Sequence, residues 1–505
     1  SLLQSYIGQR QSELARKHLD DLSNLFSQQV IECVSHLAPS GTRSTLFAAR
    51  ALGFARDHGI RAILSNDVRI LTRADAPLAD ILDSVRHLTP LHEKNVKRLN
   101  AEAFLKSSSE MYQVAKELAH AAAERSPDRI LRETSNLAEE VMLSAREEIG
   151  IGQIHLPEPE MVGARDIDEM VQIFRQRALA GLNLRYSSEV SEERYRQIRQ
   201  RLDDEMNAIR ILGFESYFLT VADVAAGARD LGIRVAARGS GAGSLVCYLL
   251  GIGGVDPLAH GLIMERFCSP LRRELPDIDI DVESARRLEI YDLVFRRYGS
   301  QVATVAMVDK YRARHAIRDV GMALAISPVE IDLIAKSLPH VRARRISEVI
   351  DSLPELRSIQ RSIQRSGSTI ENGSLLRMAI GLAERLDSIP RNLAMHPCAV
   401  AISDSNFSAI APLEINASGY PMISFDKDDV EDIGLLKLDI LGVRMQSALA
   451  YTVDEIKRVT GQSIELDQVP LDDHATFELI QSTKTLGLFQ IESPGQRELV
   501  GKFAP

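Results

Sequence analysis

Four acidic residues alternate with aliphatic residues in the stretch LPDIDIDVE, from Leu275 to Glu283. Side chains alternate between the two faces of an extended strand, so Ile278, Ile280 and Val282 would share one face. The other face would carry the acids Asp277, Asp279, Asp281 and Glu283. Neighbouring carboxylates repel each other unless they take up protons or share a cation. The pattern therefore predicts a strand whose acidic face meets metal, solvent or basic side chains.

Asp277 and Asp279 would be neighbours on this acidic face. Their oxygens can share one or two Mg²⁺ ions, which prefer carboxylate and phosphate oxygens to nitrogen or sulfur ligands. Two such ions about 3.5–4 Å apart can activate an attacking hydroxyl and stabilise a leaving pyrophosphate oxygen. The same alternation also fits an exposed edge strand whose solvated charges prevent aggregation. Nearby arginines and the aliphatic opposite face favour the metal site.

A glycine-rich segment, ARGSGAGSLVCYLLGIG, places small residues between the strand-like IRVAA and a helix that begins near Leu245. Glycine lets the backbone approach a ligand closely, and the free N–H groups at a helix start attract anions such as phosphate. The segment lacks the lysine of a P-loop and the spacing of a GxGxxG dinucleotide site. A tight strand-to-helix turn with close packing explains it equally well.

Lys437 and Asp439 are the only charged residues in the apolar run GLLKLDILGV. A charge inside a buried strand is rarely tolerated without a partner, and alternation puts both side chains on one face. If this strand lies beside the acidic one, Asp439 completes a carboxylate triad with Asp277 and Asp279, and Lys437 reaches a phosphate. The alternatives are a local ion pair or a lysine that extends into solvent.

Length and composition indicate a globular protein. The 505 residues suffice for roughly three domains, and 45% hydrophobic and 26% charged content is ordinary for such proteins. A formal net charge of -10 disfavours a protein that coats nucleic acid through bulk charge. The four cysteines form no CxxC pair, and the chain has neither a long apolar run nor a signal-peptide pattern. We therefore expect a reducing, cytoplasmic location and no membrane partner.

Helical and strand-like stretches alternate along the chain, which indicates a mixed α/β fold. TLFAARALGFARDHG is typical of a helix ending at glycine, and the apolar IRAILSNDVRIL after it is typical of a strand. The proline-containing IGQIHLPEPEMVG predicts a boundary between Gly150 and Gly163. The stretch from Tyr311 to Arg391 is helix-rich, with SIQRSIQRSGSTIENGS as an exposed loop, and the strand-like CAVAIS and GLLKLDILGV follow it.

Six segments follow one another in order: ARGSGAGSLVCYLLGIGGVDPL, MERFCSP, LPDIDID, AIRDVG, SFDKDDVEDIGLLKLDILGVR and GLFQIESPGQREL. This series resembles the catalytic core of the bacterial C-family DNA polymerases, the polymerase III alpha subunits. The resemblance extends from Ile63 to the end of the chain. Each motif is weak by itself, but six in sequence make a chance match improbable.

The resemblance implies a nucleotidyltransferase palm related to polymerase beta, with an inserted helical thumb and a partial PHP-type α/β domain before it. In this family the acidic strand and the later KxD strand both belong to the palm. Asp277, Asp279 and Asp439 match the catalytic acids that bind two Mg²⁺ ions. Gly239 and Ser240 match the residues that hold the triphosphate of the incoming nucleotide.

Two basic residues, Arg266 and Lys437, match positions that contact phosphate in the family. Asp281 also matches a family acid, but we assign it no metal role. The family commonly has glycine where Ala237 stands and varies around His396. His396 would either contact substrate or pack as a core histidine, and the second interpretation is the safer one.

The resemblance also implies domain boundaries. Residues 1–150 would be the C-terminal part of a PHP-like domain, 151–308 the first part of the palm, 309–391 the thumb, 392–444 the second part of the palm, and 445–505 the start of the fingers. Two basic clusters near the thumb would either contact DNA phosphate or form a solvated helix face. They are Arg342, Arg344 and Arg345, and Lys310, Arg312, Arg314 and Arg318.

The segment SNDVRIL resembles a part of the PHP domain where metal-binding members carry an Asp-x-His pair. Here Asp67 is present and Arg69 replaces the histidine. The histidine-rich part that precedes it in the family is absent from this chain. We therefore expect no phosphatase or proofreading nuclease activity from this region.

The expected activity is template-directed transfer of dNMP from a dNTP to a primer 3′ hydroxyl in bacterial DNA replication, with two Mg²⁺ ions as cofactors. The partners would be primer-template DNA and dNTP, and, through regions outside this chain, the sliding clamp, the clamp loader and other replisome subunits. Three alternatives stay open: an error-prone translesion polymerase of the same family, a non-catalytic scaffold fragment, and a template-independent nucleotidyltransferase.

Overall fold

The computed structural model describes residues 2–92, 98–148, 150–186, 190–263, 275–357, 360–361, 372–466, 469–470 and 472–505. Arg266 and most of the predicted loop SIQRSIQRSGSTIENGS lie outside these residues. The chain divides into two compact units, and each unit is built from two segments. The first unit joins Ser1–Leu143 to Asp309–Asn392, and the second joins Ser144–Val308 to Leu393–Pro505.

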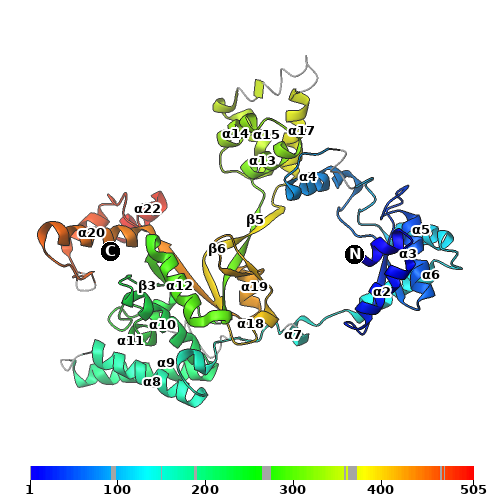
Figure 1. Ribbon diagram of the computed structural model, residues 1–505. Helices are drawn as coiled ribbons and strands as arrows, with labels where there is room; N and C mark the ends of the chain where they lie inside the picture. Colours follow the sequence, from blue (N-terminus) through cyan, green and yellow to red (C-terminus); the bar gives the residue numbers. More distant parts are fainter. Residues whose placement is uncertain are drawn as a thin grey trace. The chain divides into compact units, whose positions relative to one another are not determined.

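The N-terminal segment of the first unit is a small α/β layer (Figure 1). Strands β1 (Val30–Val34) and β2 (Arg61–Ser65) pair in parallel. The helices of this segment that surround them are α1 (Leu2–Gly8), α2 (Ser12–Ser23), α3 (Thr45–Asp57), α5 (Ser108–Ala121) and α6 (Asp128–Glu140). Apolar side chains of these strands and helices form one buried core. The helix predicted for TLFAARALGFARDHG and the strand after it are confirmed as α3 and β2.

The second segment of the first unit is helical, as the sequence predicts. It contains α13 (Ala313–Ala323), α14 (Pro328–Ser337), α15 (Ile346–Ser352) and α17 (Asn372–Arg385). Leu78 and Ile81 of α4 (Ala76–His87) belong to the same buried core as these helices. Figure 1 shows α4 beside α13 and α17. This apolar core holds the two segments of the first unit together.

A mixed sheet of seven strands forms the centre of the second unit, with the order β3-β4-β9-β6-β5-β8-β7. The strands are β3 (Ala236–Arg238), β4 (Asp279–Glu283), β5 (Val302–Lys310), β6 (Pro390–Ile402), β7 (Leu413–Ile415), β8 (Pro421–Ile423) and β9 (Leu436–Val443). The predicted strands CAVAIS and GLLKLDILGV are confirmed as parts of β6 and β9. Because β9 inserts between β4 and β6, the sheet brings together segments that are far apart in the chain.

The acidic strand is shorter than predicted and lies inside the sheet. β4 begins at Asp279, whereas the alternation predicted a strand from Leu275. Its antiparallel partner β3 ends at Arg238, which pairs with Asp279, and Pro276 has no N–H group to donate to a ladder. β4 also pairs in parallel with β9. The alternative of an exposed edge strand is therefore wrong.

The two faces of the sheet differ in chemistry. Ile278, Ile280 and Val282 are fully buried in the largest apolar core. The helices that supply this core are α8 (Ile167–Arg185), α9 (Glu192–Leu212), α10 (Glu215–Asp230), α11 (Leu245–Leu249) and α12 (Arg287–Tyr298). The alternate residues of β4 are acidic, as the period of two predicts.

Six further α-helices belong to the described part of the second unit. They are α7 (Ala145–Glu148), α18 (Phe407–Ile410), α19 (Lys427–Asp432), α20 (Arg444–Thr460), α21 (His474–Gln481) and α22 (Pro494–Phe503). Among the described residues, no single helix has both the length and the apolar character needed to cross a membrane. Only α9 and α10 taken together meet that test, and they are bent by 113° at their junction.

A buried carboxylate holds the end of the glycine-rich segment. Glu205 of α9 is 1% exposed and accepts a hydrogen bond from the Ser244 hydroxyl at 2.9 Å. It also accepts hydrogen bonds from the amides of Leu245 (3.1 Å) and Val246 (3.0 Å). These amides open α11 and have no partner within the helix. Arg201 pairs with the same carboxylate at 2.6 Å, so the segment is fixed to α9.

Replacing Glu205 by alanine is expected to lower the free energy of unfolding by about 3 kcal/mol, because the change leaves buried donors and a guanidinium without their acceptor. Urea unfolding of the chain measures the effect. Asp203 is exposed on the same helix, and its replacement by alanine should change stability by no more than about 0.5 kcal/mol. Equal losses in the two variants would contradict the role given to Glu205.

Candidate metal centre

The pairing of β4 with β9 brings the three acids singled out in the sequence together. Asp279 and Asp439 are direct partners across the parallel ladder, and Asp277 lies just before β4. One carboxylate oxygen from each of the three lies within 4.8 Å of the others. The described residues thus contain a cluster of three carboxylates at the edge of the unit's largest core.

This cluster fits a divalent cation by its donor set and by its electrostatics. Three carboxylate oxygens are the kind of ligand that Mg²⁺ prefers. Burial, followed by the charges of Asp277 and Asp439, raises the pKa of Asp279 from 3.8 to about 6. Within the described residues, the buried Oδ1 of Asp279 has no hydrogen-bond partner. A cation would satisfy this oxygen and relieve the repulsion.

A buried tyrosine fixes the backbone on both sides of Asp277. The Tyr217 hydroxyl, from α10, donates to the carbonyl oxygen of Pro276 and accepts from the amide of Ile278 at 3.1 Å. Tyr217 is fully buried, and its position is therefore set by the apolar core. No pattern in the sequence singles out Tyr217, because a tyrosine in an apolar helix is usually a core residue.

Lys437 lies among the carboxylates of the cluster. Its Nζ is 3.5 Å from Asp277 Oδ1 and 3.4 Å from Asp439 Oδ2. A third acid, Glu431 of α19, lies 3.0 Å from the same Nζ. Burial alone would lower the pKa of Lys437, but the Glu431 hydrogen bond and the charges of Asp439 and Asp277 raise it. Glu431 was not predicted as a site residue, because the acid run DKDDVED is typical of a solvated helix.

A cavity of about 540 Å³ opens beside Lys437. The residues that line it include the acids Asp277, Glu431 and Asp432, together with Gly152 and Gln153 of the predicted boundary segment. The lysine is therefore reachable from a space large enough for a small polar ligand.

The glycine-rich segment starts beside the cluster. Gly239 follows β3 directly and has a φ of +74°, a backbone conformation that favours glycine. A Cβ atom at Gly239 would lie 3.8 Å from Asp279 Oδ2. At Gly243 a Cβ atom would come within 2.8 Å of the Ile263 carbonyl oxygen. Ser240 follows in the 3-10 turn Gly239–Gly243.

Asp281 is turned to a different partner. The Arg238 guanidinium donates to Asp281 Oδ2 through Nη2 at 2.7 Å and through Nε at 3.1 Å. This pair is internal to the sheet, because Arg238 belongs to β3 and Asp281 to β4. This contact gives Asp281 a structural role. The sequence motifs assigned it no metal role either.

His396 and Cys398 of β6 approach Asp439 from the other side. The Cys398 thiol donates to Asp439 Oδ1 at 3.4 Å, and its Sγ is 3.6 Å from His396 Nδ1. Burial lowers the pKa of His396 and raises the pKa of Cys398 to about 12. His396 Nδ1 accepts a hydrogen bond from the Ala399 amide at 3.1 Å. His396 is thus half-buried at the cluster, and not a fully packed core histidine.

The sequence of this chain matches known polymerase domains. The profile of the bacterial DNA polymerase III alpha NTPase domain matches residues 172–442, which is more than half of the chain. The profile of the finger domain of the same subunit matches residues 445–505. The chain belongs to the bacterial DNA polymerase III alpha family. The resemblance found in the sequence motifs is confirmed.

Relatives in the polymerase III alpha family carry two kinds of name. The error-prone DNA polymerase of Pseudomonas fluorescens (strain Pf0-1) is 33% identical over 90% of this chain and 42% of its own length. That of Symbiobacterium thermophilum is 35% identical over 91% of this chain and 39% of its own length. The DNA polymerase III subunit alpha of Bacillus subtilis is 30% identical over 91% of this chain and 39% of its own length. The chain spans about two fifths of the length of these relatives.

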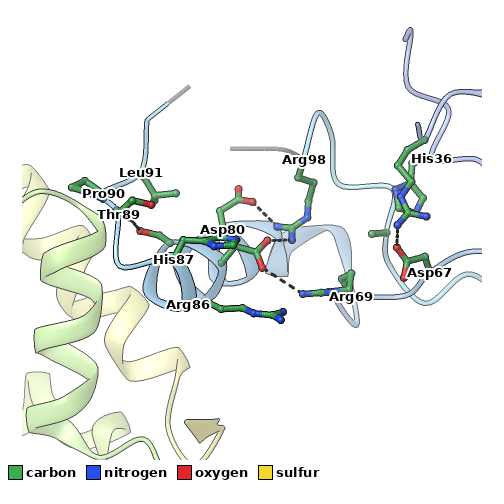
Figure 2. A pocket seen from close by; sticks show the side chains of 14 residues that line it. His36, Asp67, Arg69, Asp80, Arg86, His87, Thr89, Pro90, Leu91 and Arg98 are labelled. Atoms are coloured by element: carbon green, nitrogen blue, oxygen red, sulfur yellow. Dashed lines mark hydrogen bonds and ion pairs between the residues drawn. The ribbon is translucent and has the colours of Figure 1, made fainter. Parts of the chain in front are cut away.

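The N-terminal segment of this polymerase III alpha chain also has an acid-lined cavity, of about 290 Å³, shown in Figure 2. Each acid in it has an arginine partner. Arg43 pairs with Asp67, Arg69 with Asp83 at 3.4 Å, and Arg98 with Asp80 at 2.5 Å. No group of three or more metal-ligating side chains lies close together among the described residues of this segment.

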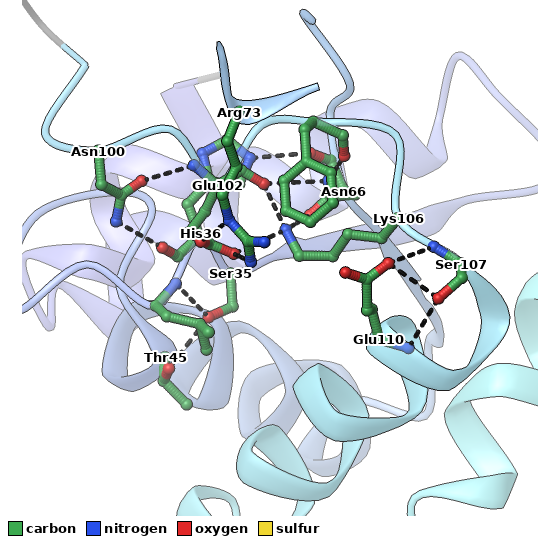
Figure 3. Close-up of polar contacts among 12 residues, drawn as sticks. Ser35, His36, Thr45, Asn66, Arg73, Asn100, Glu102, Lys106, Ser107 and Glu110 are labelled. Atoms are coloured by element: carbon green, nitrogen blue, oxygen red, sulfur yellow. Dashed lines mark hydrogen bonds and ion pairs between the residues drawn. The ribbon is translucent and has the colours of Figure 1, made fainter. Parts of the chain in front are cut away.

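Polar side chains near the ends of the two strands of this segment contact one another (Figure 3). The Asn66 side chain, just after β2, donates to the carbonyl oxygen of Phe104 at 2.6 Å, and His36 Nε2 lies 2.8 Å from the Asn66 carbonyl oxygen. Lys106 is almost fully buried and donates to Asn66 Oδ1 at 3.1 Å. These hydrogen bonds give the polar groups a structural role.

Most of the basic residues predicted to contact DNA phosphate have partners within the first unit. Arg342 lies 3.2 Å and Arg344 4.0 Å from Asp387. Arg345 pairs with Glu348 at 2.6 Å, and Arg318 pairs with Asp332 at 3.0 Å. Their phosphate role remains a prediction.

The raised pKa of Asp279 makes stability depend on pH in the metal-free protein. Between pH 3.8 and about pH 6, Asp279 keeps its proton in the folded state but loses it in the unfolded chain. Protonation therefore favours the folded state, and this contribution to stability is present at low pH and is lost as the pH rises through about 6. Asp279→Asn cannot ionise and should lack this decline. Urea unfolding in EDTA at a series of pH values checks it, with the exposed Asp428→Asn as control. The same pH profile in wild type and Asp279→Asn would contradict the assignment.

Proposed function

We propose that this chain carries the catalytic centre of a template-directed DNA polymerase, which transfers dNMP from a dNTP to a primer 3′ hydroxyl. The observation that carries the proposal is the register of β4 and β9, which sets Asp279 opposite Asp439 and within reach of Asp277. Membership of the polymerase III alpha family supplies the reaction class.

Asp277, Asp279 and Asp439 would hold two Mg²⁺ ions, since the three carboxylates present a donor set made only of oxygen. When bound, these ions favour the attacking 3′ oxygen and stabilise the pyrophosphate that leaves. Tyr217 would keep Asp277 in position by fixing the backbone around it. Asp279 must lose its proton to bind a cation, so a pKa of about 6 leaves it ready to do so near neutral pH.

The triphosphate of the dNTP would lie between the glycine-rich segment and Lys437. Gly239 and Ser240 would offer backbone N–H groups, and Lys437 would exchange a carboxylate contact for a phosphate oxygen. Arg266 would also contact phosphate. The 3′ oxygen then forms a bond to the α-phosphorus, the bond to the bridging oxygen breaks, pyrophosphate leaves, and the hydroxyl proton passes to water. Catalysis comes chiefly from positioning and charge stabilisation.

The fold supports the domain assignment proposed from the motifs. Residues 151–308 and 392–444 would form the palm around the seven-stranded sheet. Residues 309–391 would form the thumb, which is helical and is inserted in the chain between β5 and β6. Residues 445–505 would begin the fingers, and 1–150 would be the end of a PHP-like domain. Primer-template DNA would be the direct partner. Clamp, clamp loader and other replisome subunits would bind through other regions.

We assign no phosphatase or proofreading nuclease activity to the N-terminal segment. Asp67 is engaged by Arg43, and Arg69 stands where a metal-binding domain of this type has histidine. An arginine cannot bind a metal ion, because its guanidinium stays protonated.

Primer extension tests the assigned acids. Asp279→Ala should lower templated, Mg²⁺-dependent incorporation by at least about 100-fold, because it removes a ligand of the ions that stabilise the transition state. Asp439→Asn should behave in the same way. The reactions are run with and without template, and Mg²⁺-dependent dNTP binding is followed in parallel.

The matched control is Asp428→Ala, which changes an acid that is 77% exposed at its side chain and outside the cluster. It should incorporate at the wild-type rate. Unchanged incorporation by Asp279→Ala would refute the metal role. Extension without a template would favour a template-independent transferase, and a lack of Mg²⁺-dependent dNTP binding would favour a scaffold.

Error-prone synthesis is a second candidate within the same chemistry. It is favoured by the error-prone polymerases among the relatives at 33–35% identity. A polymerase of this kind should extend mismatched primer ends and insert opposite damaged bases at rates close to those on normal template. Single-nucleotide insertion kinetics for correct and incorrect dNTPs measure this. Discrimination as strong as that of the Bacillus subtilis alpha subunit, assayed alongside, would exclude it.

A further inference from the structure

Cys398, His396 and Asp439 form a second group of possible metal ligands, one of two such groups among the described residues. Its chemistry differs from that of the three carboxylates, because it offers one sulfur, one nitrogen and one oxygen. Mg²⁺ avoids sulfur and nitrogen, whereas Zn²⁺ binds all three. The group lies inside the second unit and draws on β6 and β9.

The spacing of the ligand atoms suits a tetrahedral zinc ion. Zinc lies about 2.3 Å from thiolate sulfur and about 2.0–2.1 Å from nitrogen or oxygen, so tetrahedral angles put its ligand atoms about 3.3–3.6 Å apart. Cys398 Sγ is 3.6 Å from His396 Nδ1 and 3.4 Å from Asp439 Oδ1. Each of the three residues offers a ligand atom that lies within 4.8 Å of those of the other two. These two sulfur distances need little change to accept an ion.

The hydrogen bonds around the group show which atoms carry lone pairs and which carry protons. The amides of Cys398 (3.4 Å) and Ala399 (3.1 Å) donate to His396 Nδ1, which therefore carries the lone pair and not the proton. The Cys398 S–H points at Asp439. On binding, zinc would replace this shared proton, which passes to solvent, and would displace the two amide contacts. No oxidation or reduction is involved.

We propose that Cys398, His396 and Asp439 bind a zinc ion, with water or a substrate oxygen in the fourth position. Asp439 belongs to both groups of ligands, so zinc would compete with the carboxylate cluster for this side chain. Zinc should therefore inhibit nucleotide incorporation in competition with Mg²⁺. This consequence rests on the proposed polymerase function, but zinc binding itself does not.

The binding test uses the whole chain and Co²⁺, which replaces zinc and has visible and near-ultraviolet absorption. Wild type should show a thiolate-to-cobalt charge-transfer band and the strong visible bands of a four-coordinate site, and one equivalent of Zn²⁺ should abolish both. Cys398→Ser keeps a hydroxyl donor toward Asp439 but removes the thiolate, and His396→Gln removes the nitrogen. Each should weaken cobalt binding by more than about 100-fold, since loss of a group outside the ligand set already costs roughly 10–100-fold.

The control variants separate the zinc site from other thiols and from catalysis. Cys33→Ser changes a buried thiol of the first unit and should keep the band. Asp279→Asn should also keep it, although it loses incorporation if the proposed function is right. A wild-type chain without the band, or a band that persists in Cys398→Ser, would overturn the zinc site.

The activity arm measures zinc inhibition of primer extension, with each protein compared with its own zinc-free rate. Cys398→Ser should raise the zinc concentration for half-inhibition by more than about 100-fold, and added Mg²⁺ should raise it in wild type. Equal zinc sensitivity in wild type and Cys398→Ser would overturn the link to catalysis. A chain that binds cobalt through Cys398 but extends no primer would contradict the polymerase function and leave the zinc site established.

Discussion

Repulsion among Asp277, Asp279 and Asp439 is the constraint on which the second unit depends. Three carboxylates with oxygens within 4.8 Å of one another oppose folding unless other contacts hold them there. The aliphatic residues between and beside them supply that force. Ile278, Ile280, Leu438 and Ile440 are fully buried, and each such burial stabilises the fold by about 1.5–3 kcal/mol. The acids are therefore brought together by the apolar face of the same strands.

Repulsion between acids is relieved in different ways in the N-terminal cavity and in the carboxylate cluster of the second unit. In the N-terminal cavity, arginines pair with Asp67, Asp80 and Asp83, so their charges are neutralised by the protein itself. In the second unit, Asp277 and Asp439 share the ammonium of Lys437, and within the described residues the Oδ1 atom of Asp279 has no hydrogen-bond partner. The first arrangement suits a structural role. The arrangement in the second unit leaves negative charge that a bound cation can neutralise.

The topology of the sheet explains how one site draws on distant parts of the chain. β9 lies between β4 and β6 although it follows both in sequence. The helical segment within Asp309–Asn392 leaves the sheet after β5 and returns at β6, so it packs in the first unit without changing the order of the strands. β6 also brings His396 and Cys398 to Asp439. A single aspartate thereby connects a cluster of hard oxygen ligands with a softer group of mixed ligands.

Local sequence patterns were enough to predict many of the elements and the chemistry of their faces. Alternation in LPDIDIDVE and GLLKLDILGV separates charged from apolar faces, because side chains of a strand point alternately to its two sides. Motif order was sufficient to indicate the polymerase family, and helical periodicity predicted the segment after Tyr311. Local patterns carry this information, since they depend only on neighbours in the chain.

Which elements meet in space became known from the three-dimensional arrangement of the chain. The register that sets Asp279 opposite Asp439, the Tyr217 clamp around Asp277 and the contact of Glu431 with Lys437 all join residues from separate segments. So does the early end of β3, which makes the acidic strand start at Asp279 and not at Leu275. Pairing across a sheet and packing in a core depend on the whole chain at once, and for that reason no local pattern contains them.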